Sequence, residues 1–164
     1  MPHKFTVASL RMWLSVFALA LVAAAPAMAA DDKAGGADAD KAALQGTWQN
    51  TASEVNGQKE PEEDAKQYQV SFEGDKMTIR RAGDVIMKGA FKLDVGQTPR
   101  QIDFKIEENP RDPEAVGKTL AGIYEVKGEE LKWCFAMPDR ERPKAFKTEA
   151  DSGQVFATLK KEKK

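Results

Sequence analysis

The sequence predicts an all-β protein whose strands form an antiparallel up-and-down β-barrel of about eight strands. Three observations support this prediction. Apolar and polar residues alternate with a period of two in successive runs between residues 46 and 161. Short turns that contain glycine separate the runs, and no long helical pattern interrupts them. A meander of this kind can close on itself, which removes the unpaired edges of the sheet.

The alternation decides the face of each strand. Tyr68, Val70 and Phe72 alternate with polar residues, so one face of this run is apolar, as a half-buried strand requires. Ile102 and Phe104 continue the same pattern in a later run. The predicted strands are 46–55, 67–73, 76–81, 84–93, 100–107, 118–127, 130–136 and 154–161.

The segments between the runs are typical of tight turns. Asn56-Gly57 and Ser152-Gly153 place residues that tolerate positive φ where the chain must reverse. Residues 61–65 can form one short helix, because a proline stands in the first turn and acidic residues lie near the positive end of the dipole. An open β-sandwich is the alternative fold. Pairing between the first and last strands would distinguish the barrel from it.

Residues 1–29 have the features of a signal peptide. Basic residues precede an apolar core from Met12 to Val22, and Ala27-Met28-Ala29 has the small-x-small form that signal peptidase needs. We expect cleavage after Ala29 and export to the periplasm or the cell exterior, with no stable membrane insertion afterwards. A retained membrane anchor is the alternative, because the apolar stretch is nearly long enough to span a bilayer.

The rest of the chain divides into three parts. Residues 30–43 are small and charged without apolar periodicity, which predicts a flexible acidic linker. Residues 44–161 form the predicted barrel domain, which is large enough for one hydrophobic core. Residues 162–164 are a basic tail.

The composition excludes several classes of function. The chain has 25 basic and 26 acidic residues, and its lysines alternate with acids, so the clustered positive charge of a nucleic-acid-binding protein is missing. His3 is the only histidine and lies in the predicted leader, which excludes a Ser-His-Asp or Cys-His arrangement and a His-rich zinc site in the mature chain. We therefore predict a protein that is not an enzyme and uses no metal or cofactor.

Cys134 is the single cysteine, which excludes an intrachain disulfide. It lies in the hydrophobic strand 130–136, where a thiol behaves as a small apolar residue. We expect it to be buried and inert, and an intermolecular disulfide is the alternative.

Motifs typical of one domain family run along residues 44–161. They are Leu44-Gln45-Gly46-Thr47-Trp48, Glu54-Val55-Asn56-Gly57, Phe72-Glu73-Gly74-Asp75-Lys76, the segment from Gly117 to Tyr124, Leu131-Lys132-Trp133-Cys134-Phe135, Arg142-Pro143 and Ser152-Gly153-Gln154-Val155. With these motifs the chain resembles an uncharacterised lipocalin-like domain family found mainly in exported planctomycete proteins. The resemblance implies the barrel fold and export, and it assigns no activity or functional residues.

Gly46 and Trp48 are also similar to the start of the first strand in lipocalins. In those proteins the glycine permits close backbone approach, the tryptophan plugs the closed end of the barrel, and a cation from the last strand stacks over the ring. The resemblance implies that Lys160, or Lys161 beside it, supplies this cation. We expect Trp48 to be a structural plug rather than a ligand contact.

Two functions remain open for the barrel. The first is to bind a small apolar or amphipathic molecule in a pocket that opens at one end, with Arg142 as a candidate polar contact for an anionic group. The second is a non-catalytic structural or interaction module of the cell envelope, whose interior is packed solid and whose partner is a cell-envelope protein. The candidate cavity residues, which would fill the interior in the second case, are Tyr68, Phe72, Met87, Phe91, Phe104, Tyr124 and Trp133.

Overall fold

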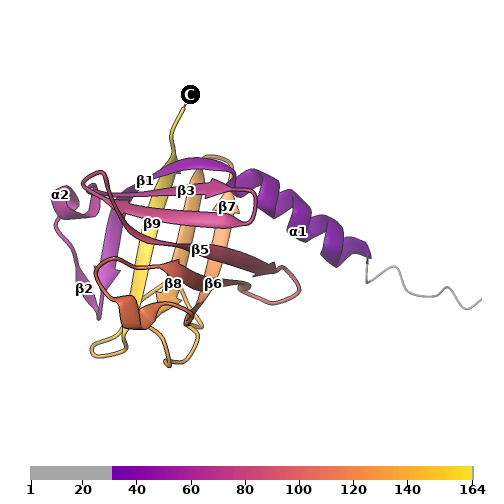
Figure 1. Ribbon diagram of the computed structural model, residues 1–164. Coiled ribbons are helices and arrows are strands. Elements are labelled where there is room, and N and C mark those ends of the chain that lie inside the picture. Colours follow the sequence, from indigo (N-terminus) through magenta and orange to yellow (C-terminus); the bar gives the residue numbers. More distant parts are fainter. Residues whose placement is uncertain (1–30, 164) are drawn as a thin grey trace, which may run out of the picture.

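The computed structural model describes residues 31–163, so the predictions for the leader at 1–29 lie outside the described residues. Figure 1 shows a β-barrel with one longer helix leading into it. The elements in chain order are α1 (Asp31–Leu44), β1 (Gly46–Val55), β2 (Gln58–Lys59), α2 (Glu62–Ala65), β3 (Tyr68–Glu73), β4 (Lys76–Arg81), β5 (Asp84–Asp94), β6 (Arg100–Glu108), η1 (Pro113–Ala115), β7 (Thr119–Lys127), β8 (Glu130–Ala136) and β9 (Gln154–Lys161).

Eight of these strands close into an antiparallel barrel, as predicted. From β3 to β9 each strand pairs with the next along the chain, and β1 pairs with both β3 and β9. The pairing of β1 with β9 excludes the open sandwich. β2 is a short extra strand attached to β1, and a strand of two residues gives no alternation by which the sequence could reveal it. The other strand bounds agree with the predicted ones to within one residue.

The prediction of a flexible linker over residues 30–43 is wrong, because Asp31–Leu44 forms the helix α1. Gly36, Asp40 and Leu44 follow one another at intervals of four residues, so they share one face of α1. This face lies against the barrel, because Gly36 approaches Val95 and both Asp40 and Leu44 are buried. Tertiary contacts therefore stabilise a segment whose own pattern is weak. None of the helices within residues 31–163 is long and apolar enough to cross a membrane.

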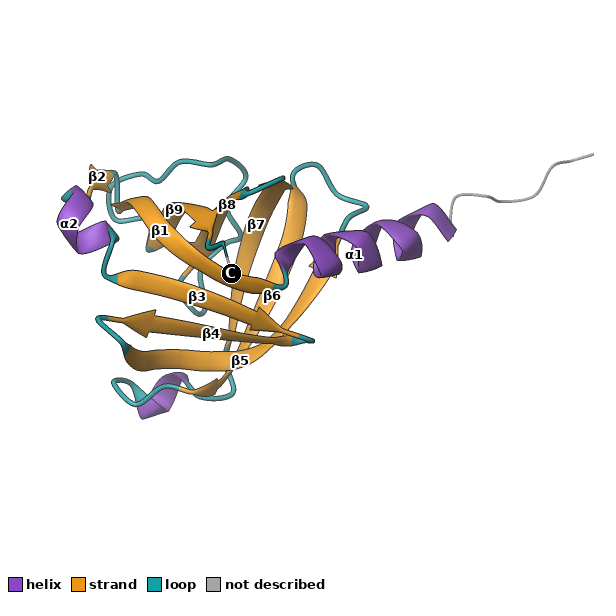
Figure 2. Ribbon diagram, turned by 90° about the horizontal axis from the view of Figure 1, so that it is seen from above, coloured by secondary structure: helices purple, strands orange, loops and turns teal. Residues whose placement is uncertain are grey.

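The barrel has two different ends. At the end that receives α1, the interior is filled by large side chains that are at most 1% exposed, among them Trp48, Phe72 and Phe104. Phe91 packs edge-on against Phe72, with ring centroids 5.2 Å apart. Figure 2 shows α1 and α2 on opposite sides of the barrel, α1 at the filled end and α2 beside β2. We call the two ends the closed end and the open end.

Glycine permits tight contacts at two inward positions. A Cβ atom on Gly89 would lie 1.9 Å from the Lys105 carbonyl oxygen, so β5 and β6 can approach this closely only without a side chain there. A Cβ atom on Gly122 would lie 2.5 Å from the Phe135 ring. Both glycines therefore serve the closure and packing of the barrel.

Candidate functional site

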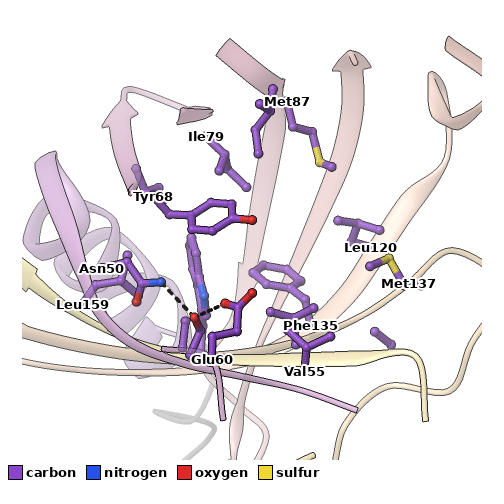
Figure 3. A pocket seen from close by; sticks show the side chains of 17 residues that line it. Asn50, Val55, Glu60, Tyr68, Ile79, Met87, Leu120, Phe135, Met137 and Leu159 are labelled. Carbon is purple, nitrogen blue, oxygen red and sulfur yellow. Dashed lines mark hydrogen bonds between the residues drawn. The ribbon is translucent and has the colours of Figure 1, made fainter. Parts of the chain in front are cut away.

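A cavity of about 380 Å³ lies at the open end of the barrel. Its walls come from the parts of the strands that are distant from α1, including Val55 at the end of β1 and Val155 at the start of β9. Met137, which is 49% exposed, lies among the lining residues, so the cavity reaches the surface. Figure 3 shows the lining side chains gathered around this space.

The walls of the cavity are mostly apolar. Val70, Ile79 and Leu120 line it together with Phe135 and Leu159, so a guest would contact hydrocarbon and aromatic surface on most sides. Such a lining favours apolar ligands, because removing apolar surface from water is the main source of binding energy.

One wall carries a cluster of polar side chains. The Asn50 amide Nδ2 lies 3.4 Å from Ser53 Oγ, and the Ser53 hydroxyl donates a hydrogen bond to Glu60 Oε2. Asn50 and Ser53 are only 4% and 7% exposed. In Figure 3 the Tyr68 hydroxyl points into the space that the lining residues surround, and the Glu60 carboxylate lies below the Tyr68 ring.

A β-bulge in β1 brings this cluster together. Asn50 pairs with Leu159 and Ala52 with Thr158, so Thr51 is the extra residue in the strand. Before the bulge the inward positions are Trp48 and Asn50, and after it they are Ser53 and Val55. The bulge thus allows two polar residues three positions apart to face the same cavity.

Of the seven residues predicted to line a cavity, the structure brings three together at this site. Tyr68, Met87 and Trp133 line it. Phe72, Phe91, Phe104 and Tyr124 do not, because they occupy the packed core toward the closed end. The sequence could not separate the two groups, since the alternation of residues gives the face of a strand and not the height along the barrel axis.

Tyr124 has a polar role at the closed end. Its hydroxyl donates to Asp40 Oδ2 at 2.6 Å, and the same carboxylate accepts hydrogen bonds from Arg100 Nη1 at 2.6 and 2.7 Å. Burial raises the pKa of Tyr124 far above its ordinary value, and the neighbouring Asp40 adds to the effect. These contacts hold α1 against β6 and β7.

Trp48 lies at the closed end with no exposed surface, which is the position expected of a plug. Its indole Nε1 donates to the Leu44 carbonyl at 2.7 Å. Of the two lysines expected to supply the cation, the structure selects Lys161 and not Lys160: Lys161 Nζ lies 5.2 Å from the ring centroid of Trp48, and Lys160 is exposed. The reason is the period of two, because position 161 continues the inward face of β9.

Lys161 and Trp48 also bind backbone carbonyls at the C-terminal end of α1. Lys161 Nζ donates to the Ala43 carbonyl at 2.8 Å, next to the Leu44 carbonyl that Trp48 binds. Carbonyls in the last turn of a helix lack intrahelical partners, and a cation there also interacts favourably with the helix dipole. The backbone at Gly46 takes a φ of 110°, which glycine permits between the helix and β1.

Arg142 lies outside the cavity lining. Its Nη1 donates to the Gly122 carbonyl at 2.6 Å and its Nη2 lies 2.5 Å from Asp103 Oδ1. The guanidinium therefore ties the loop after β8 to β6 and β7, which is a structural arrangement.

Cys134 is buried, as predicted. Burial raises the pKa of its thiol to about 12, which keeps the sulfur protonated and unreactive at neutral pH.

Sequence reasoning missed Asn50, Ser53 and Glu60. The signal for Asn50 and Ser53 was the presence of polar residues on the inward face of β1, and this signal appears only once the bulge at Thr51 is known. Glu60 lies in the connection after β2, where the alternation of residues gives no signal. Within residues 36–163 no group of three or more His, Cys, Asp or Glu side chains is placed to hold a metal ion.

The comparisons with known proteins do not name a family for this chain. No protein-family model matches it, and a search of curated proteins gives no match.

Proposed function

We propose that this protein binds one small apolar or amphipathic molecule in the cavity at the open end of its barrel. The observation that carries the proposal is the cavity of about 380 Å³, which has a mostly apolar lining and reaches the surface. Ligand sites in proteins commonly measure about 300–1,000 Å³ and combine apolar walls with a few polar groups.

The proposal includes export and excludes catalysis. Export rests on the leader sequence at residues 1–29 and on the resemblance to exported lipocalin-like planctomycete domains. An interaction module of the cell envelope would need no internal space, so the open cavity favours a carrier over that alternative.

A cavity-filling variant tests the proposal. Ala157 lines the cavity and is 4% exposed, so Ala157→Leu places three further carbon atoms in the space for a ligand. Ala52→Leu is the matched control, because Ala52 lies on the neighbouring strand and is exposed on the outer surface. The probe is the neutral fluorophore N-phenyl-1-naphthylamine, followed by its emission on titration.

We expect saturable one-to-one binding by the wild-type protein and by Ala52→Leu, and a loss of about tenfold or more in affinity for Ala157→Leu. Native mass spectrometry of the gently purified protein would then look for a co-purified small molecule. Absence of saturable binding by the wild-type protein, or full affinity in Ala157→Leu, would contradict the proposal.

A further inference from the structure

The polar side chains at the cavity offer more hydrogen-bond acceptors than donors. Ser53 has one hydroxyl proton, and it donates this proton to Glu60, whose carboxylate can accept hydrogen bonds but not donate one. Ser53 Oγ can therefore only accept from Asn50, which fixes the orientation of the Asn50 amide with Nδ2 toward Ser53. The Asn50 Oδ1 atom therefore faces away from Ser53.

Asn50 Oδ1 has no hydrogen-bond partner and is buried. An unpaired buried carbonyl costs about 1–3 kcal/mol. Asn50 Oδ1 is the one unpartnered buried side-chain polar atom that residues 36–163 contain. The Asn50 Oδ1 atom has almost no accessible surface, so it is closed off from the cavity, and the Glu60 carboxylate is the acceptor that the cavity offers to a guest.

The residues that line the cavity carry negative charge only. Glu60 is the single ionisable acid among the described lining residues, and none of them is a lysine or arginine. No ion pair within 4 Å involves Glu60 in the part of the chain that the structure describes. Outside the lining, the Arg81 guanidinium lies 5.3 Å from the centroid of the Tyr68 ring.

We propose that the ligand is an amphipathic molecule whose polar group donates a hydrogen bond, a hydroxyl or an ammonium, with the Glu60 carboxylate as the acceptor. This inference rests on the proposed function and specifies its ligand class. A ligand that ends in a carboxylate would add a second acceptor and a second negative charge beside Glu60, which the site cannot pair.

Three ligands of equal chain length test the inference: decylamine, decan-1-ol and decanoic acid. Each competes against bound N-phenyl-1-naphthylamine at pH 7, below its micelle concentration. We expect decylamine, decan-1-ol or both to bind at least about tenfold more tightly than decanoate. Tighter binding of decanoate than of the other two ligands overturns the inference.

Two variants distinguish the hydroxyl from the ammonium. Glu60→Gln removes the charge, so an ammonium ligand should lose its preference over decanoate while an alcohol keeps it. Glu60→Leu removes both the charge and the acceptor and should weaken the alcohol as well. Glu63→Gln is the control, because Glu63 is an exposed acid on α2. Circular dichroism and thermal unfolding of each variant establish that it is folded.

The outcomes separate this inference from the proposed function. Equal competition by all three ligands, or a preference that neither variant alters, overturns the inference and leaves the carrier function standing. Failure of the wild-type protein to bind the probe or any of the three ligands overturns both.

Discussion

The two ends of the barrel differ in how completely their buried polar side chains are hydrogen-bonded. At the closed end the Asp40 carboxylate is paired by both Tyr124 and Arg100, and Trp48 and Lys161 pair the carbonyls that end α1. At the open end the carbonyl of Asn50 has no partner. The comparison teaches that the closed end pairs its buried polar groups, which stabilises the fold, whereas the open end keeps a buried carbonyl that no group in the described residues pairs.

The two ends of the barrel also differ in how tightly their apolar side chains are packed. The closed end is filled by residues with almost no exposed surface, and the open end leaves space between half-buried ones such as Tyr68 and Met87. Stability should therefore depend mainly on the first region and binding on the second. The following predictions test this division, beginning with the largest expected effect.

Trp48→Ala should lower the free energy of unfolding by about 3–5 kcal/mol, because it leaves a large void at the closed end. Tyr68→Ala should cost about 1 kcal/mol or less, because its side chain is half-buried beside an existing cavity. Chemical denaturation measures both values. Probe binding should show the reverse order, with Tyr68→Ala weakened and folded Trp48→Ala near the wild-type affinity. Similar stability losses in the two variants would refute the division.

Asp40→Ala and Asn50→Leu should change stability in opposite directions. Asp40→Ala leaves the buried Tyr124 hydroxyl without its acceptor and should cost about 1–3 kcal/mol. Asn50→Leu removes an unpaired buried carbonyl and should be neutral or stabilising by up to about 1 kcal/mol. Thermal and urea unfolding check the signs. A clear loss in Asn50→Leu would show that this amide contributes to the fold.

Lys161→Met should cost about 0.5–1 kcal/mol, because it removes the cation over Trp48 and the donor to the end of α1. Lys160→Met is the matched control and should stay within about 0.5 kcal/mol of the wild-type protein, since Lys160 is exposed. Urea unfolding of the two variants in parallel measures the difference. Equal effects would contradict the assignment of the stacking cation to Lys161.

The stabilising contribution of Tyr124 should decrease at high pH. Its pKa is raised in the folded protein, so the folded state holds the phenolic proton more tightly than the unfolded chain does. The contribution is complete below the ordinary tyrosine pKa of 10.0 and declines as the pH rises above it. The stability gap between wild type and Tyr124→Phe should therefore narrow between pH 8 and pH 11 in urea unfolding. A constant gap would contradict this.

The sequence predicts the barrel well because alternation and turn residues are local signals. The strands from 46 to 161 follow from them almost to the residue. α1 could not be predicted, since its helical state depends on contacts of Asp40 and Leu44 with a barrel that is distant in sequence.

Only part of the site could be predicted. Tyr68, Met87 and Trp133 follow from the inward face of their strands, but the polar cluster depends on a single extra residue, Thr51. A bulge exchanges the two faces of a strand within one step, and nothing in the composition of β1 reveals where that step occurs.

The pairing of β1 with β9 has a consequence for the order of events during synthesis. Asn50 lies opposite Leu159, so one wall of the cavity joins the first strand of the barrel to β9. A nascent chain in which β9 has not yet been synthesised exposes two strand edges and lacks this wall, whatever structure its earlier strands have reached. The cavity therefore forms only after β9 has been synthesised and has paired with β1.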